Sequence, residues 1–190
     1  MKKFPNLETK RLQLREFRLT DAQAVFEIFS QDAVTKYHNL ETMTSAGQAV
    51  NLVRGRIGIF NHDVGIRWAI VMQNDPDIVI GSCGFYDLDK DHRSAEIGYD
   101  LHPAYWHQGI MTEALRAGIN FGYSDRFYFH LNRIQALTYL DHKISGLLLL
   151  KLGFQEEGIL RNYGYWKGEY HDLRVYSLIR EDWENYTTNS

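Results

Sequence analysis

The spacing of hydrophobic and polar positions predicts strands in about seven segments of this chain. Residues 11–17 alternate, with Leu12 and Leu14 on one side, as a half-buried strand does. Residues 66–72 form a nearly continuous apolar run, and the turn sequence N-D-P-D separates this run from the next one. In chain order the predicted strands are residues 11–17, 66–72, 78–86, 94–101, 133–139, 154–165 and 170–179.

Helical spacing predicts two helices between the first and second strands. T-D-A-Q at residues 20–23 has the pattern of a capping box and places the start of the first helix at Thr20. The second begins near Thr44, because its apolar residues step by four and three. Residues 36–40, between these helices, form an irregular aromatic and polar segment that we expect to border a site.

Two further helices are expected in the second half of the chain. One runs from Gly109 to about Phe127, and a shorter one covers about residues 143–152. Gly153 then ends the shorter helix in the left-handed conformation that glycine prefers. Glycines at 118 and 122 inside the longer helix cost roughly 2 kcal/mol against alanine, so we expect this helix to pack closely on the sheet.

The order of these elements predicts an α+β (mixed α/β) fold around one central sheet. A chain of 190 residues is long enough for one domain with a substantial core. We therefore expect residues 1–190 to form a single domain.

Composition and charge argue against several classes of function for this chain. The net charge of -3 argues against a nucleic-acid-binding protein, which usually has a basic face. Cys83 is the one cysteine, so neither an intramolecular disulfide nor a cysteine metal cluster is expected, and its apolar surroundings predict a buried, inert thiol. No apolar run reaches the roughly 18 residues that span a bilayer, and the N-terminus lacks the apolar stretch of a signal peptide. These features predict no membrane association and a cytoplasmic protein.

Residues 96–113, E-I-G-Y-D-L-H-P-A-Y-W-H-Q-G-I-M-T-E, predict a seat for an anion. They combine the end of a strand, a break at Pro103 and a helix that starts near Gly109. Helix starts leave backbone N–H groups without partners and carry partial positive charge. Gly109 lets the backbone approach an anion closely, because it has no Cβ atom. A phosphate is the anion that such a turn typically binds.

Several segments, taken in order, resemble a known family. They are E-T-K-R-L-Q-L-R-E-F near the start, I-G-S-C-G-F-Y-D-L-D, A-E-I-G-Y-D-L-H-P-A-Y-W and G-I-M-T-E-A in the middle, and K-L-G-F-Q-E-E-G-I-L-R and W-K-G-E-Y-H-D-L-R-V-Y-S-L-I-R-E-D-W at the end. The chain resembles the GNAT superfamily of acyl-CoA-dependent N-acetyltransferases, in the Rim-type branch of ribosomal-protein N-terminal acetyltransferases. The resemblance covers nearly the whole chain.

The resemblance implies a mostly antiparallel sheet of about seven strands, flanked by about four helices and splayed between its fourth and fifth strands. Acetyl-CoA would fill this opening, with its pantetheine arm paired to the backbone from Tyr99 to Leu101. Its pyrophosphate would lie on the N–H groups of His107, Gln108, Gly109, Ile110, Met111 and Thr112.

This chain departs from the family pattern at two places. The family usually has glycine where His107 stands, and a side chain there would either crowd the phosphates or hydrogen-bond one. His142 replaces an asparagine that commonly contacts the cofactor, whereas Ser145 is retained. His142 and Ser145 are therefore further candidates for cofactor binding.

Amine acetylation requires a base and a proton donor. Glu96 is the candidate base, acting through water, and similar proteins place a glutamate there. The alternative is a half-buried glutamate that holds a loop or a salt bridge. Ser145 is the candidate donor near the sulfur, with capping of the short helix as its alternative role. Tyr139 is an alternative donor, although a core position is the commoner fate of a tyrosine.

The other histidine, acidic and aromatic residues give weaker predictions of function. His171 and Asp172 are adjacent on a strand and point to opposite faces, so they cannot act as a dyad. The histidines show no metal-ligand spacing, and no metal is expected. Aromatic residues that would line an acceptor groove or simply pack are Trp106, Tyr163, Tyr165 and Trp166.

The resemblance implies an enzyme that moves acetyl from acetyl-CoA to a primary amine, with a protein N-terminus as the first candidate acceptor. A small-molecule amine, such as a polyamine, an amino sugar or a drug, is the alternative; a wide groove favours peptides and a closed pocket favours metabolites. A non-catalytic acyl-CoA-binding module is the alternative from a different class, and His107 and His142 keep it open. A homodimer is compatible with the long aromatic C-terminal hairpin.

Overall fold

The structure, a computed structural model, describes residues 3–188. Within this range the strands form an eight-stranded sheet in the order β1-β2-β3-β4-β5-β6-β8-β7. The strands are β1 (Leu7–Glu8), β2 (Leu12–Arg15), β3 (Ile66–Met72), β4 (Asp75–Asp89), β5 (Ser94–Leu101), β6 (Arg133–Tyr139), β7 (Gln155–Trp166) and β8 (Glu169–Ile179). All neighbouring strands are antiparallel except β5 and β6.

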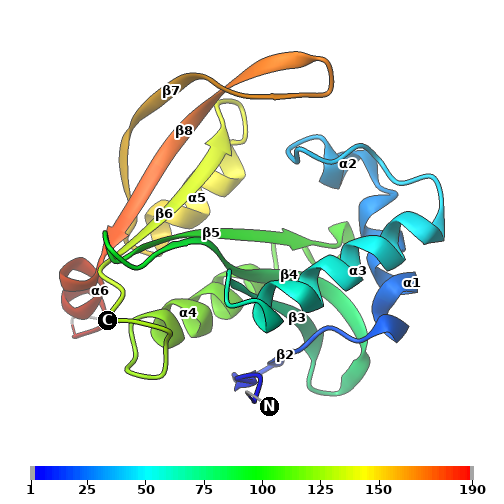
Figure 1. The fold of residues 1–190 in the computed structure, drawn as a ribbon, viewed down its shortest axis with the longest axis horizontal. Helices are drawn as coiled ribbons and strands as arrows, with labels where there is room; N and C mark the ends of the chain where they lie inside the picture. The colour runs from blue at the N-terminus through cyan, green and yellow to red at the C-terminus, as the bar shows by residue number, and fades with distance from the viewer. Residues whose placement is uncertain (1–2, 189–190) are drawn as a thin grey trace.

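Six α-helices and two short 3₁₀ helices accompany the sheet in the described residues. They are η1 (Leu19–Asp21), α1 (Ala22–Phe29), α2 (Asp32–Thr35), α3 (Ala46–Asn61), η2 (Pro103–Tyr105), α4 (Ile110–Gly122), α5 (Lys143–Lys151) and α6 (Arg180–Thr188). Helices α1 and α3 cover one face of the sheet and α4 covers the other, so the molecule has three layers around β2 to β5 (Figure 1).

The sheet divides between β5 and β6. These strands pair in parallel only from Ser94 to Glu96, opposite Arg133 to Gln135. Beyond this point β6, β8 and β7 lean away from β5, and the tip of the β7–β8 hairpin lies opposite α2 (Figure 1). The expected splaying between the fourth and fifth predicted strands is confirmed, because those strands correspond to β5 and β6.

Close packing of α4 on the sheet is also confirmed. A Cβ atom on Gly122 would lie 2.8 Å from the ring of Phe85, and one on Gly118 would lie 3.8 Å from Trp68. Because both rings are almost fully buried, the small residues let the helix axis approach the strands. Cys83 is buried as predicted, and burial raises the pKa of its thiol to about 12.

Some predicted boundaries and counts were wrong. The short β1 is an eighth strand, and α2 and α6 bring the helices to six. Helix α4 ends at Gly122, about five residues before Phe127, because the chain turns into an aromatic cluster around Phe127. The segment 78–86 was too short, since β4 already begins at Asp75.

The capping box predicted at Thr20 was also wrong. Thr20 lies inside η1, and the Asp21 carboxylate instead accepts a hydrogen bond from the Arg18 backbone N–H at 2.7 Å. The capping box forms at the other helix start, where the Gln48 side chain accepts from the Ser45 N–H at 3.0 Å. Gly153 adopts the predicted left-handed conformation, with φ of 88°.

Candidate active site

A cavity of about 1060 Å³ occupies the opening between β5 and β6. Its walls include the start of α4, one side of α5, and residues of both sheet faces beyond Glu96. All of the predicted site residues line it except Gln108, whose side chain instead donates to the carbonyl of Ala104. Residues 36–40 also line it, as their composition predicted. The residues that the sequence singled out therefore lie together around one cavity, and their roles stay a prediction.

The start of α4 has the features of an anion seat. No described residue accepts a short, well-aligned hydrogen bond from the backbone N–H groups of residues 107–112, apart from the weak bonds of the tight turn itself. Gly109 is the N-cap and has φ of 72°, which is the left-handed region that favours glycine. His107 has φ of 59° and is exposed, so this turn takes the conformation that a glycine would take. A non-glycine residue there costs about 1 kcal/mol.

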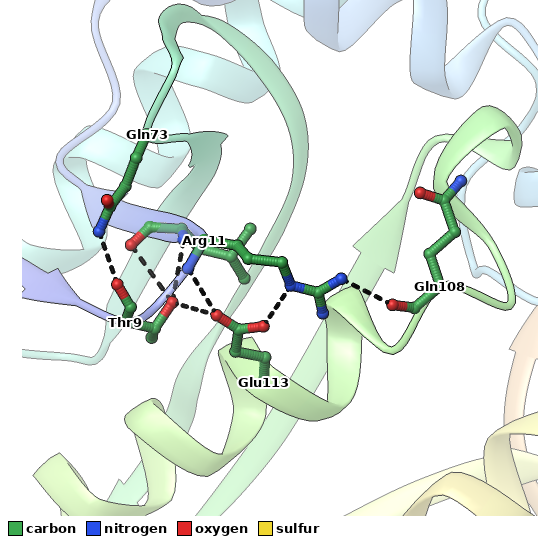
Figure 2. Close-up of polar contacts among 6 residues, drawn as sticks. Thr9, Arg11, Gln73, Gln108 and Glu113 are labelled. Carbon is green, nitrogen blue, oxygen red and sulfur yellow. Dashed lines mark hydrogen bonds and ion pairs between the residues drawn. The ribbon is translucent and has the colours of Figure 1, made fainter.

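A polar cluster holds this turn in place (Figure 2). The Glu113 carboxylate accepts hydrogen bonds from the Arg11 Nε atom at 2.7 Å, the Arg11 backbone N–H at 2.9 Å and the Thr9 hydroxyl at 2.6 Å. Arg11 then donates from Nη1 to the Gln108 carbonyl oxygen at 3.0 Å. The guanidinium group therefore ties the turn to the start of β2, and its Nη2 lies 3.6 Å from where a Cβ atom of Gly109 would be.

The edge of β5 that faces the opening has unpaired backbone groups. Successive residues of a strand direct their backbone groups to opposite edges. Since the His102 N–H donates to Ile80 on β4, the groups of Leu101 and Tyr99 face the other way, toward β6. The pairing with β6 ends at Glu96, and the Leu101 carbonyl accepts from the Trp106 indole at 2.8 Å. The backbone groups of Tyr99 thus remain available to an extended ligand.

Glu96 is buried at the narrow end of the opening, with 7% of its surface exposed. Its carboxylate accepts hydrogen bonds from the Tyr86 hydroxyl and, at 3.4 Å, from the Gln135 side chain. Burial raises the pKa of Glu96, and these two hydrogen bonds act in the opposite direction. Gly98 leaves room for Tyr86, because a Cβ atom there would lie 2.9 Å from its ring. Such an environment suits a carboxylate that takes up a proton.

Tyr99 and Ser145 connect the two walls of the cavity. Their hydroxyl oxygens are 2.6 Å apart. Burial raises the pKa of Tyr99, so this hydroxyl keeps its proton at neutral pH. Ser145 lies in the first turn of α5 but makes no capping hydrogen bond to that helix. Its hydroxyl contacts the Tyr99 hydroxyl instead. The sequence identified Tyr99 by its backbone only, and its hydroxyl is a functional group that the sequence reasoning missed.

Helix α2 and the residues that follow it (32–40, the α2 segment) cover one side of the cavity. Tyr37 stacks on His142 with ring centroids 3.9 Å apart, and the Lys167 ammonium group donates to the Thr35 carbonyl at 2.6 Å. The Tyr139 hydroxyl donates to the His38 carbonyl at 3.4 Å and accepts from the Trp166 indole. Tyr139 is therefore occupied in joining the α2 segment to the hairpin.

The remaining candidates divide between the cavity and the surface. Trp106, Tyr163 and Trp166 line the cavity, whereas Tyr165 does not and packs edge-on against Tyr170. His171 and Asp172 have separate partners, as predicted: the imidazole contacts the Trp166 carbonyl and the carboxylate accepts from the Asn162 N–H. No group of three metal-ligating side chains occurs in the described residues.

Comparisons with known proteins agree with this geometry. The family model of the acetyltransferase (GNAT) domain matches residues 11–155. YoaA of Bacillus subtilis, an uncharacterised N-acetyltransferase, is 41% identical over 93% of this chain and 98% of its own length. The [ribosomal protein uS5]-alanine N-acetyltransferase of Escherichia coli is 33% identical over 68% of each chain. A crystal structure of a GNAT-family acetyltransferase from Bacillus anthracis has a TM-score of 0.80 and 24% identity, covering 93% of this chain and 99% of its own.

This chain belongs to the GNAT acetyltransferase family. It is an N-acetyltransferase, and its relatives include enzymes that acetylate ribosomal proteins, as the sequence predicted. Enzymes of this family use acetyl-CoA, and the seat at α4 and the open edge of β5 fit its pyrophosphate and its pantetheine arm. No helix within residues 3–188 has both the length and the apolar character needed to cross a bilayer.

Proposed function

We propose that this enzyme transfers the acetyl group of acetyl-CoA to a primary α-amine, with a protein N-terminus as its acceptor class, and that residues 1–190 form one domain for this reaction. The observation that carries the proposal is the continuous path from the free N–H groups at α4, along the unpaired edge of β5, to Glu96. Acetyl-CoA bound along this path would have its thioester beside a buried carboxylate.

The binding roles follow from the same path. The N–H groups of residues 107–112 would hold the pyrophosphate, and the Tyr99 backbone together with the Leu101 N–H would hold the pantetheine arm, since the Leu101 carbonyl already accepts from Trp106. Ile110 and Met111 begin the helix, so their N–H groups point out of its first turn. His107 and His142 border the cavity and would contact the bound molecule from opposite walls.

Glu96 would act as the base through a bridging water. An ammonium group has no lone pair, so the acceptor must lose a proton before its nitrogen bonds to the acetyl carbon. An α-amine, with a reference pKa near 8, loses this proton more easily than a lysine, near 10.4. As the nitrogen–carbon bond forms, the carbon–sulfur bond breaks and the nitrogen gives up its second proton through the water at Glu96. The Tyr99–Ser145 hydroxyl pair would pass a proton to the departing thiolate and recover one from solvent.

The acceptor class rests on relatives and on the cavity. The Escherichia coli relative is named a [ribosomal protein uS5]-alanine N-acetyltransferase, and its match covers 68% of this chain. Lys167 of the β7–β8 hairpin contacts the Thr35 carbonyl and narrows this side of the cavity, which disfavours an internal lysine loop but leaves both a chain end and a small amine as acceptors. The named relative is therefore what favours the chain end.

Two experiments in sequence test this proposal. Calorimetry with acetyl-CoA is expected to show binding, and thiol release with a panel of peptides and small amines is expected to show turnover. Mass spectrometry then identifies which products carry the acetyl group. Acetylation of peptide α-amines supports the proposal, and exclusive acetylation of metabolites would replace the acceptor. Binding without turnover for any amine would identify a non-catalytic module.

A further inference from the structure

A buried charge cluster lies on the same face of β5 as Glu96. Asp100 accepts hydrogen bonds on one oxygen from Arg56 of α3 at 2.9 Å, from Arg67 of β3 at 2.6 Å and from the Ser82 hydroxyl at 2.5 Å. The side chains of Asp100, Arg56 and Arg67 are 0%, 7% and 13% exposed. All three residues also line the cavity.

The cluster contains two guanidinium groups and one carboxylate. Although burial opposes ionisation, Arg56 and Arg67 lower the pKa of Asp100 to about 2, so its charge is fixed. His38 adds no charge, because burial lowers its pKa to about 4. Arg56 also contacts the rings of Phe17 and Phe29, which ease its burial without accepting a full hydrogen bond. Within this cluster one positive charge exceeds the carboxylate, and Glu96 on the same face bonds to Tyr86 and Gln135 rather than to either guanidinium group. Buried charges are normally paired.

Polar atoms of the cluster also lack partners. Arg56 Nη1 and Asp100 Oδ1 are buried and have no hydrogen-bond partner among the described residues. Arg67 uses Nε for Ser82 and Nη2 for Asp100, which leaves its Nη1 without a hydrogen bond to any described residue. Folded proteins leave few such atoms. An anion from outside the chain can accept from the Nη1 atoms of Arg56 and Arg67, whereas Asp100 Oδ1 is itself an acceptor and needs a donor such as water.

The distance between the guanidinium groups and Glu96 limits the length of the molecule that could bind to both. Arg67 Nη1 lies 3.1 Å from where a Cβ atom of Gly98 would be. Glu96 is two residues earlier on the same face, about 7 Å along the strand. A small molecule or a chain end can therefore reach the base with its amine and the guanidinium groups with another group.

We propose that the acceptor carries a compact anion, a carboxylate or a phosphate, about 7 Å from its reacting amine, and that Arg67 and Arg56 bind it. This inference rests on the proposed function, because it takes Glu96 as the place of the amine. Guanidinium groups pair with either anion through parallel hydrogen bonds. Peptides with an acidic second residue, and small molecules with an amine and an anion at opposite ends of a short chain, satisfy this chemistry. Polyamines do not, since they bring positive charge to a positive cluster.

A matched series of amines tests the preference on the unchanged enzyme. The series contains 4-aminobutyrate and 5-aminopentanoate against butylamine and pentylamine, 3-aminopropyl phosphate against 3-aminopropanol, peptides that begin Ser-Glu against Ser-Gln, and spermidine. Each anionic amine is expected to exceed its neutral partner at least tenfold in kcat/KM, and the preferred member of the series shows whether the anion belongs to a metabolite or a peptide. Equal rates for the paired amines, or a preference for spermidine, would overturn the inference.

Variants of the cluster show which residue is responsible for the preference for anionic amines. Arg67→Gln is expected to raise KM for the anionic amines about tenfold and to leave the affinity for acetyl-CoA unchanged, whereas Arg67→Lys restores part of the preference. Arg54→Gln is the matched control, because Arg54 lies on α3 beside Arg56 but is exposed and outside the cavity. An undiminished preference in Arg67→Gln would contradict the inference.

A direct binding measurement separates this inference from the proposed function. Propionate and inorganic phosphate are titrated into the protein loaded with CoA, and the thermal midpoint is followed. Stabilisation in the wild type that is lost in Arg67→Gln supports the anion site even if no amine is acetylated. Absence of stabilisation together with normal turnover would overturn the inference and leave the proposed function standing.

Discussion

Glu96 is the residue on which the proposed chemistry depends most. Glu96→Gln removes the group that takes the proton but retains the hydrogen-bonding shape, so we expect kcat to fall by roughly 10²–10⁴-fold. The affinity for acetyl-CoA measured by calorimetry should remain unchanged. Burial raises the pKa of Glu96, so the acidic limb of the wild-type rate profile should lie above pH 4.5 and disappear in the variant. Full turnover of Glu96→Gln from pH 6 to 9 would exclude this role.

The buried ion pairs of Asp100 lead to a separate prediction about stability. Asp100→Asn leaves Arg56 and Arg67 without a counter-charge, so we expect the free energy of unfolding at pH 7 to fall by about 3–5 kcal/mol. The folded-state pKa of Asp100 is lowered from 3.8 to about 2. Its stabilisation is therefore complete above about pH 4 and is lost as the pH falls toward 2. Urea unfolding of both proteins between pH 7 and 2.5 measures the difference, and a difference that is constant with pH would contradict the assignment.

At the scale of elements, Arg11 is expected to position the turn before α4. Arg11→Ala removes its bonds to the Gln108 carbonyl and to Glu113, so the N–H groups of the turn lose a fixed orientation. We expect the Kd for acetyl-CoA to rise about tenfold, as the loss of one charge-assisted hydrogen bond implies. The kcat at saturating acetyl-CoA should stay close to that of the wild type.

Arg18→Ala is the control for this measurement. Arg18 belongs to the same N-terminal segment but forms an exposed ion pair with Asp77, away from α4. Its replacement should leave the Kd for acetyl-CoA unchanged. Equal Kd values for Arg11→Ala and Arg18→Ala would show that the cluster in Figure 2 serves stability alone.

The glycines of α4 provide a matched pair of stability predictions. Gly118→Ala places its Cβ atom 3.8 Å from Trp68, an ordinary contact, so the better helix propensity should stabilise the protein by up to about 1 kcal/mol. Gly122→Ala places its Cβ atom 2.8 Å from the buried Phe85 ring, so overpacking should cost about 1–3 kcal/mol. Chemical denaturation measures both, and effects of the same sign would contradict the packing described for α4.

At the scale of the whole molecule, local patterns predicted the order of strands and helices and the cavity. Periodicity identifies β6 to the residue, because its burial alternates along its whole length. The anion seat was predictable because its strand, turn and helix are adjacent in sequence. The two-residue strand β1 and the four-residue helix α2 show the limit, since short elements carry few periodic positions.

Contacts between distant segments could not be predicted in this way. Arg56 and Asp100 are 44 residues apart, and Tyr99 and Ser145 are 46 apart. Only the folded sheet brings each pair together, so the charge cluster and the hydroxyl pair have no local signature. Tyr86 had a weaker signal, because it lies directly opposite Glu96 once the β4–β5 register is known.

We propose that the opening between β5 and β6 holds acetyl-CoA against Glu96. A crystal structure of the complex with CoA is the direct test of this binding mode. We expect the pyrophosphate oxygens within hydrogen-bond distance of the N–H groups of residues 107–112, pantetheine along the Tyr99 edge of β5, and the sulfur between Glu96 and the Tyr99–Ser145 pair. A CoA molecule bound elsewhere, or an opening filled by the His107 side chain, would contradict the claim.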